Sequence, residues 1–130
     1  MSFIESLKME PGYIGSNGRV EGEIAKAEKE LNVSFAQDYR EYLKVAGLAC
    51  FAGHEFTGLT ATERLNVVSV TKEQRSLFGE AASTWYVVEE ANIDGIVIWQ
   101  DAAGAVYQTV PNSQAEKIAD SLAEYLGIGL

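Results

Sequence analysis

Residues 23–47, EIAKAEKELNVSFAQDYREYLKVAG, carry the strongest structural pattern in the sequence. Apolar residues from Ile24 to Leu31 recur at helical spacing and face away from a charged side, which predicts a first amphipathic helix. After a short elbow, Tyr39 and Leu43 begin a second apolar stripe with the same period. The segment therefore predicts a helical hairpin whose two apolar stripes must lie against another layer of the fold.

The ends of the second helix also have sequence signals. Ser34 followed by Gln37 fits a capping box, although Phe35 could equally be the capping position. Gly47 stands where a glycine commonly ends a helix. We therefore expect this helix to begin close to Phe35 and to stop at Gly47.

Three strand-like runs supply the missing layer. They are 84–89 (TWYVVE), 95–100 (GIVIWQ) and 105–110 (AVYQTV), joined by short segments of turn composition. Such short connections are typical of an antiparallel meander. Residues 54–59 are a further plausible strand.

Helical patterns flank the three runs. Residues 66–78 resemble a middle helix ended by Gly79, although their Val-Val-Ser-Val start makes a strand a rival. Residues 114–126 are expected to form a closing helix with Leu122 on its inward stripe. The order predicts a single α+β domain over residues 1–130, in which a helical hairpin, a middle helix and a C-terminal helix pack on an antiparallel meander.

Composition sets the class of protein. The chain has 130 residues and 47% are hydrophobic, which suits one domain with a real core. A run of about 18 apolar residues, as a membrane-spanning helix needs, does not occur. The start does not resemble a signal peptide, and the single cysteine, Cys50, agrees with a reducing compartment. We therefore expect a cytoplasmic protein.

Charge is unevenly distributed. The net charge is −9; residues 1–79 hold eleven acids and nine bases, whereas residues 80–130 hold eight acids against Lys117 alone. An acidic chain repels polyanions, so direct binding to nucleic acid or to an anionic membrane is not expected. The acids either only keep the protein soluble or form a face that steers a basic partner.

Catalytic patterns are weak. Cys50 and His54 could be a thiol nucleophile and its base, but nothing near them marks an orienting group, and we expect Cys50 to be a small buried hydrophobe. A single histidine disfavours histidine-based triads and metal clusters. A carboxylate pair for glycoside hydrolysis is a less favoured interpretation. We therefore expect no catalysis, no cofactor and no metal.

The hairpin resembles the signature of the SUKH superfamily, the cell-wall-assembly regulator and knockout-killer-like family. That signature has an I-x-x-x-E-x-x-L helix, a short elbow and a Leu-Pro-x-x-Tyr-x-x-(Phe/Tyr)-Leu helix. Glu28 falls on the acidic position of the first motif and Tyr42 on the aromatic position of the second, whereas Ala36 replaces the proline. GHEFTGL, VVSVTKEQRSLFG, GIVIWQDAAGAVYQ and IADSLAEYL resemble later family segments in the same order, so the resemblance covers about residues 22–126.

The resemblance implies function by binding. Many bacterial members resemble immunity proteins that occlude secreted polymorphic toxins, commonly nucleases, and eukaryotic relatives act as regulatory interaction modules. We therefore expect an immunity protein whose partner is a protein toxin encoded nearby. The alternatives are a regulatory protein-interaction domain and, less favoured, a small acid-based hydrolase. Acids expected at strand ends and turns are the candidates for the docking face: Glu55, Glu89, Glu90, Asp94 and Asp101.

Overall fold

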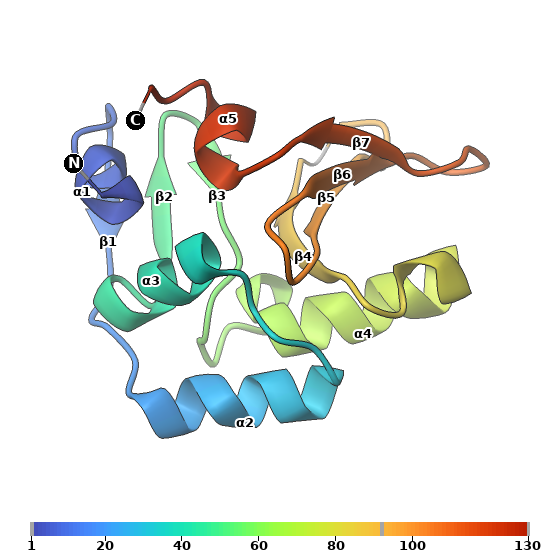
Figure 1. Cartoon of the computed structure of the whole chain (residues 1–130), viewed down its shortest axis with the longest axis horizontal. Coiled ribbons are helices and arrows are strands. Elements are labelled where there is room, and N and C mark those ends of the chain that lie inside the picture. The colour runs from blue at the N-terminus through green and yellow to red at the C-terminus, as the bar shows by residue number, and fades with distance from the viewer. Residues whose placement is uncertain (1, 92, 130) are drawn as a thin grey trace.

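The structure is a computed structural model that describes residues 2–91 and 93–129. The helices and strands follow one another as shown in Figure 1. In chain order they are α1 (Phe3–Lys8), β1 (Ile14–Gly15), α2 (Glu21–Leu31), α3 (Gln37–Val45), β2 (Ala49–Phe51), β3 (His54–Glu55), the 3₁₀ turn η1 (Glu63–Leu65), α4 (Val67–Phe78), the 3₁₀ turn η2 (Glu80–Ala82), β4 (Tyr86–Glu90), β5 (Val97–Gln100), β6 (Val106–Thr109), β7 (Glu116–Ala119) and α5 (Leu122–Leu126).

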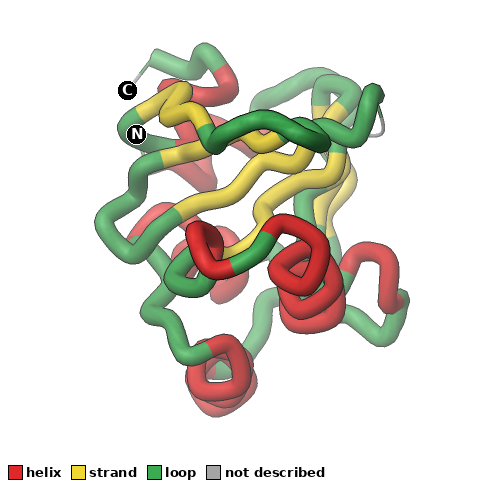
Figure 2. The backbone as a smooth tube through the Cα atoms, turned by 90° about the vertical axis from the view of Figure 1, so that its right-hand side faces the viewer, coloured by secondary structure: helices red, strands yellow, loops and turns green. Residues whose placement is uncertain are grey.

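Two antiparallel sheets organise these elements. The larger is the meander β4-β5-β6-β7, and the smaller has the order β1-β2-β3. A backbone hydrogen bond from Thr57 N to Val88 O, 2.8 Å long, joins the chain after β3 to β4. Figure 2 shows the strands in the upper half of the molecule, with α2 at the bottom and α4 seen almost end-on. The single α+β domain with a meander sheet predicted from the sequence is thus confirmed.

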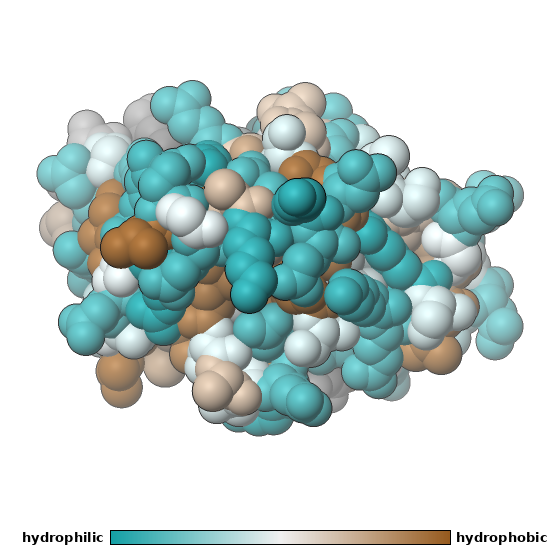
Figure 3. Space-filling view, turned by 90° about the horizontal axis from the view of Figure 1, so that it is seen from below, coloured by the Kyte–Doolittle hydropathy of each residue, from teal (hydrophilic) through white to brown (hydrophobic). Residues whose placement is uncertain are grey.

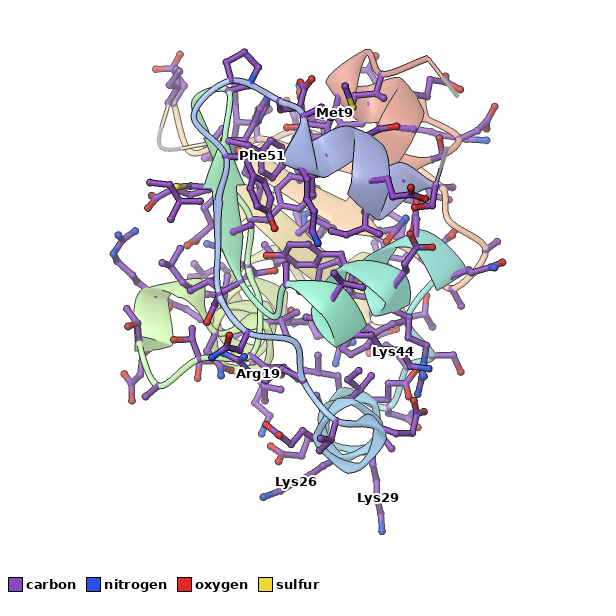
Figure 4. All side chains as sticks on the ribbon, turned by 90° about the vertical axis from the view of Figure 1, so that its left-hand side faces the viewer. Met9, Arg19, Lys26, Lys29, Lys44 and Phe51 are labelled. Carbon is purple, nitrogen blue, oxygen red and sulfur yellow. The ribbon has the colours of Figure 1, made fainter. Side chains whose placement is uncertain are left out.

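The helical hairpin of α2 and α3 lies where its apolar stripes require. Leu31, Tyr39 and Leu43 are fully buried, as is Leu122 from α5, and all four belong to one core cluster. Phe51 points into this core from β2 (Figure 4). The prediction that one core unites the hairpin with the C-terminal helix is confirmed.

The start of α3 differs from the predicted capping box. Its N-cap is Ala36, which has no side-chain cap. The Phe35 N–H donates to Glu28 Oε2 at 2.8 Å, and the Ala36 N–H donates to the Tyr86 hydroxyl at 2.9 Å. The capping box at Ser34 is therefore wrong, because groups from α2 and β4 accept the donors that precede this helix.

The middle helix α4 is confirmed, and its ends have local causes. Asn66 Oδ1 accepts the N–H groups of Val68 and Ser69 at 3.0 and 3.1 Å, which caps the first turn. Gly79 ends the helix with a φ of 105°, which favours glycine because it has no Cβ. The β-branched start therefore does not make a strand.

The closing segment 114–126 is a strand followed by a short helix, so the prediction of one continuous helix is wrong. Its first half pairs with β6 as the edge strand β7, which satisfies the outer backbone groups of β6. The helix begins only after Ser121, whose Oγ accepts the Glu124 N–H at 3.1 Å. The Ser-x-x-Glu spacing of this cap is a sequence signal that marks the true helix start.

The smaller sheet also differs from the expected strand over 54–59. In that sheet β3 is only the pair His54–Glu55, and β2 turns tightly into it through Ala52 and Gly53, with φ values of 47° and 81°. Two successive positive φ angles are typical of a type I′ turn.

None of the helices in the described part of the chain has the length and apolar character that a membrane-spanning helix needs.

Candidate partner-binding surface

A β-bulge turns Glu89 into the core. Along the β4–β5 pair, Val87 lies opposite Trp99 and the next pair is Glu89 opposite Ile98, so β4 has one extra residue. Val87 and Trp99 belong to a cluster on the outer face of the sheet, whereas Ile98 belongs to the main core on the inner face. Because side chains alternate along a strand, the extra residue moves Glu89 to the inner face.

The Glu89 carboxylate holds three elements together. The Tyr125 hydroxyl of α5 donates to its Oε1 at 2.6 Å, and His54 Nδ1 on β3 lies 3.0 and 2.9 Å from its two oxygens. Burial raises the pKa of Tyr125 above its usual range, and the bond to the carboxylate raises it further. Glu89 is only 5% exposed. The expectation that it reaches solvent is therefore wrong.

The same bulge places Glu90 on the outer face. Glu90 is half-buried opposite Val97, and Gln74 Nε2 of α4 donates to its Oε2 at 2.6 Å. Within the described residues, no lysine, arginine or histidine lies at ion-pair distance from its carboxylate. Asp94 is exposed in the turn that follows β4, where its φ is 53°. These two acids therefore lie at one end of the meander.

Glu55 lies near Glu90. It is exposed on β3 and accepts both Arg64 guanidinium nitrogens, Nη1 at 3.2 Å and Nη2 at 3.3 Å. Glu55, Arg64 and Glu90 line one small hollow of about 70 Å³. Arg64 thus forms its ion pair with Glu55, and the neighbouring Glu90 carboxylate has no ion pair among the described residues.

Asp101 lies at the opposite end of the sheet. Tyr86 pairs with Gln100, whereas Glu90 pairs with Val97, so Asp101 follows β5 on the far side from Glu90. At ~3.3 Å per residue this is a separation of roughly 13 Å along β4. Its Oδ1 accepts two backbone N–H groups of its own turn at 3.0 Å. The five acids therefore do not form one continuous face, and their role in binding a partner stays a prediction.

Cys50 and His54 are not arranged as a nucleophile and base. His54 pairs with Phe51 across the β2–β3 hairpin, so alternation places Cys50 on the other face of that sheet. His54 Nδ1 instead contacts the Glu89 carboxylate. Cys50 is half-buried, so the expectation of a buried residue is wrong. Among the described residues, no group of three or more His, Cys, Asp or Glu side chains could hold a metal ion.

A groove of about 700 Å³ lies beside Glu90, between the end of α4 and the outer face of the sheet. Leu77 and Phe78 form one wall, Val97 lies in it from β5, and Pro111 belongs to the loop after β6. The sequence pattern did not reveal this groove. Leu77 is 73% exposed, whereas the next residue, Phe78, packs against the outer cluster that contains Trp99.

The chain matches the model of the SUKH_5 family, described as SMI1-KNR4 cell-wall, over residues 2–127. The matched region runs from α1 through both sheets to α5, and the chain belongs to this family. The family includes immunity proteins, and its members are generally non-catalytic. No curated protein matches the chain.

Proposed function

We propose that this protein is an immunity protein, which binds a protein toxin encoded beside its own gene and neutralises the toxin by occluding it. The observation that carries the proposal is membership of the SUKH_5 family over residues 2–127. Binding rather than catalysis is the general behaviour of this family. Glu89 and His54 are hydrogen-bonded to each other and hold β3 against β4.

A nuclease is the toxin that the charge of this protein fits best. A nuclease needs basic surface to hold phosphate groups, and an acidic inhibitor can occupy that surface. The net charge of −9, with eight acids against Lys117 in residues 80–130, supplies the complementary sign. Steering by opposite charges also speeds association, which suits an inhibitor that must act before the toxin does.

The test is stoichiometric inhibition by the purified full chain. The probe is the C-terminal toxin domain encoded by the adjacent gene, assayed on its own substrate while the chain is titrated. Inhibition by occlusion predicts that toxin activity falls linearly and ends near a 1:1 ratio. Absence of a neighbouring toxin gene, or no inhibition at excess chain, would overturn the proposal in favour of a regulatory interaction domain.

Co-expression supplies the test in cells. Induction of the toxin domain alone should stop growth, and co-expression of the chain should restore it. A toxin from an unrelated locus is the matched control, because an immunity protein recognises its cognate partner and leaves the unrelated one active. Equal protection against both toxins would contradict the proposal.

A further inference from the structure

The outer face of the meander is only partly covered. Val87, Val97 and Trp99 form a small apolar cluster there, and α4 crosses it. Beyond the end of this cover lies the 700 Å³ groove, whose size is within the range of roughly 300–1,000 Å³ typical of ligand sites. Its wall residue Leu77 is 73% exposed, so a large apolar side chain is left in water at the mouth. An exposed apolar surface of this kind gains free energy when a partner covers it.

The groove has a defined shape at the end nearest the β4–β5 turn. Gly95 is in that turn with a φ of 71°, and a Cβ there would come within 2.9 Å of the Pro111 ring. The absence of a side chain thus lets the turn and the loop after β6 touch. Gly95 and Pro111 both line the groove, so this contact forms part of its wall.

The charge that lines the groove is negative. Among the described residues that line it, Glu90 alone is charged, and it is half-buried. Arg64, which shares a small hollow with it, forms its ion pair with Glu55 and not with Glu90. Residues 76–116 contain six acids and neither lysine nor arginine. Lys117, which follows, is bound to Asp120 at 2.6 Å. A carboxylate that is partly removed from water and lacks a counter-ion favours an incoming cation.

None of the described lysines lines the groove; Lys72 of α4 pairs with Glu30. Figure 4 shows Lys26 and Lys29 projecting from α2 into solvent and Lys44 on α3 above them. Lys44 pairs with Glu21 at 3.2 Å. The underside formed by α2 and α4 is mostly hydrophilic (Figure 3). A basic partner segment is therefore matched better by the groove, whose one charged residue is Glu90, than by the α2–α3 side with Lys26, Lys29 and Lys44.

We infer that the groove between α4 and the outer face of the meander is the docking site for the toxin, and that it receives an apolar side chain flanked by lysine or arginine. The apolar side chain fills the space between Leu77, Val97 and Pro111. The cation beside it reaches Glu90, which Gln74 holds in place through their hydrogen bond. This inference rests on the proposed function, because it names the surface through which the toxin is held.

Two groove variants test the inference, and each has a matched control. Leu77→Ala removes the exposed apolar wall, and Met9→Ala removes an equally exposed apolar side chain, 71% against 73%, at the end of α1. Glu90→Gln removes the charge and keeps a group that Gln74 can contact, while Glu23→Gln makes the same change on the exposed surface of α2. All four sites lie outside the main core cluster, so the fold should survive.

The measurement is isothermal titration calorimetry of each full-length variant against the neighbouring toxin domain. Each groove variant should weaken binding tenfold or more, because a few anchor residues carry most of the affinity of an interface. Both controls should remain within twofold of wild type. Native mass spectrometry of the purified chain should detect the protein alone.

The outcomes separate this inference from the proposed function. If the wild-type chain does not bind the toxin domain, the proposed function fails. If wild type binds and both groove variants bind within twofold of it, the docking site is elsewhere and only the groove inference fails. A small molecule that remains bound to wild type and is lost from Leu77→Ala would also overturn the inference, because the groove would then be a ligand site.

Discussion

The two faces of the meander are built from the same strands but differ in how completely they are covered. On the inner face, Tyr86 lies with Tyr39 and Tyr42 in a filled core. Each hydroxyl there has a partner, such as Thr57 Oγ1 at 2.9 Å from Tyr39 Oη. On the outer face, α4 covers only part of a small cluster and leaves a groove beside Glu90. The inner face therefore carries most of the hydrophobic core, whereas the outer face carries a small cluster and a groove open to solvent.

Identical truncations on the two faces give the largest contrast. Leu43 is fully buried and Leu77 is 73% exposed. Leu43→Ala should cost about 2–5 kcal/mol of unfolding free energy, because it leaves a cavity in a packed core. Leu77→Ala should change it by no more than about 0.5 kcal/mol. Urea denaturation measures both, and a loss below about 0.5 kcal/mol for Leu43→Ala would contradict the assignment of the core.

Asp38 tests the polar part of the inner face. Its Oδ2 accepts the Leu122 N–H at 3.0 Å, and its Oδ1 accepts Gln100 Nε2 at 2.9 Å, so it joins α3 to α5 and β5. Asp38→Ala should cost about 1–3 kcal/mol, since Gln100 is fully buried and loses a partner. Asp120→Ala is the control, because its surface pair with Lys117 should contribute only about 0–1 kcal/mol. Equal losses in the two variants would mean that Asp38 does not hold these elements together.

Charge reversal on the outer face should change kinetics and leave the fold intact. Glu90→Lys combined with Asp94→Lys should slow association with the toxin domain roughly tenfold or more at low salt, because the reversed charges repel a basic partner that the wild-type acids attract. The difference should shrink at about 1 M salt, where the Debye length is around 3 Å. Surface plasmon resonance at two ionic strengths measures this. Salt-independent association of wild type, with an unchanged double variant, would exclude an acidic docking rim.

The smallest expected effect lies far from both faces, on the exposed side of the helical hairpin. Hydrogen bonds from Arg40 and Lys44 lower the pKa of Glu21 to about 2, from a usual 4.5. Because the folded pKa is the lower one, the contribution of Glu21 to stability is present above about pH 4.5 and is lost as the pH falls toward 2. Carbon-13 NMR titration of the carboxyl should give this low value in wild type and a higher one in Arg40→Gln. The same pKa in both would show that Arg40 does not hold it down.

The local sequence pattern was sufficient to predict an element where one of its sides is buried and the other faces solvent. The apolar stripes of 23–47 predicted α2 and α3 because a helix that buries one side repeats every 3.6 residues. The same reasoning located α4 and the three central strands. It failed for 114–119, where the need of β6 for a paired edge outweighed a helical pattern. It also failed at the cap of α3, where Glu28 and Tyr86 supply acceptors from elsewhere in the chain.

The candidate site likewise has features that the sequence determined and features that only tertiary structure determined. The sequence by itself determined that residues 80–130 are acidic and that three of the meander strands are joined by short turns, because these properties depend on residue type and local spacing. Which acid lies on the outer face was decided only by tertiary structure. Strict alternation along TWYVVE would place Glu89 with Val87 on the outer face, but the bulge exchanges the positions of Glu89 and Glu90. The groove likewise depends on tertiary structure, because its lining comes from α4, β4, β5 and the loop after β6, which are distant in the sequence.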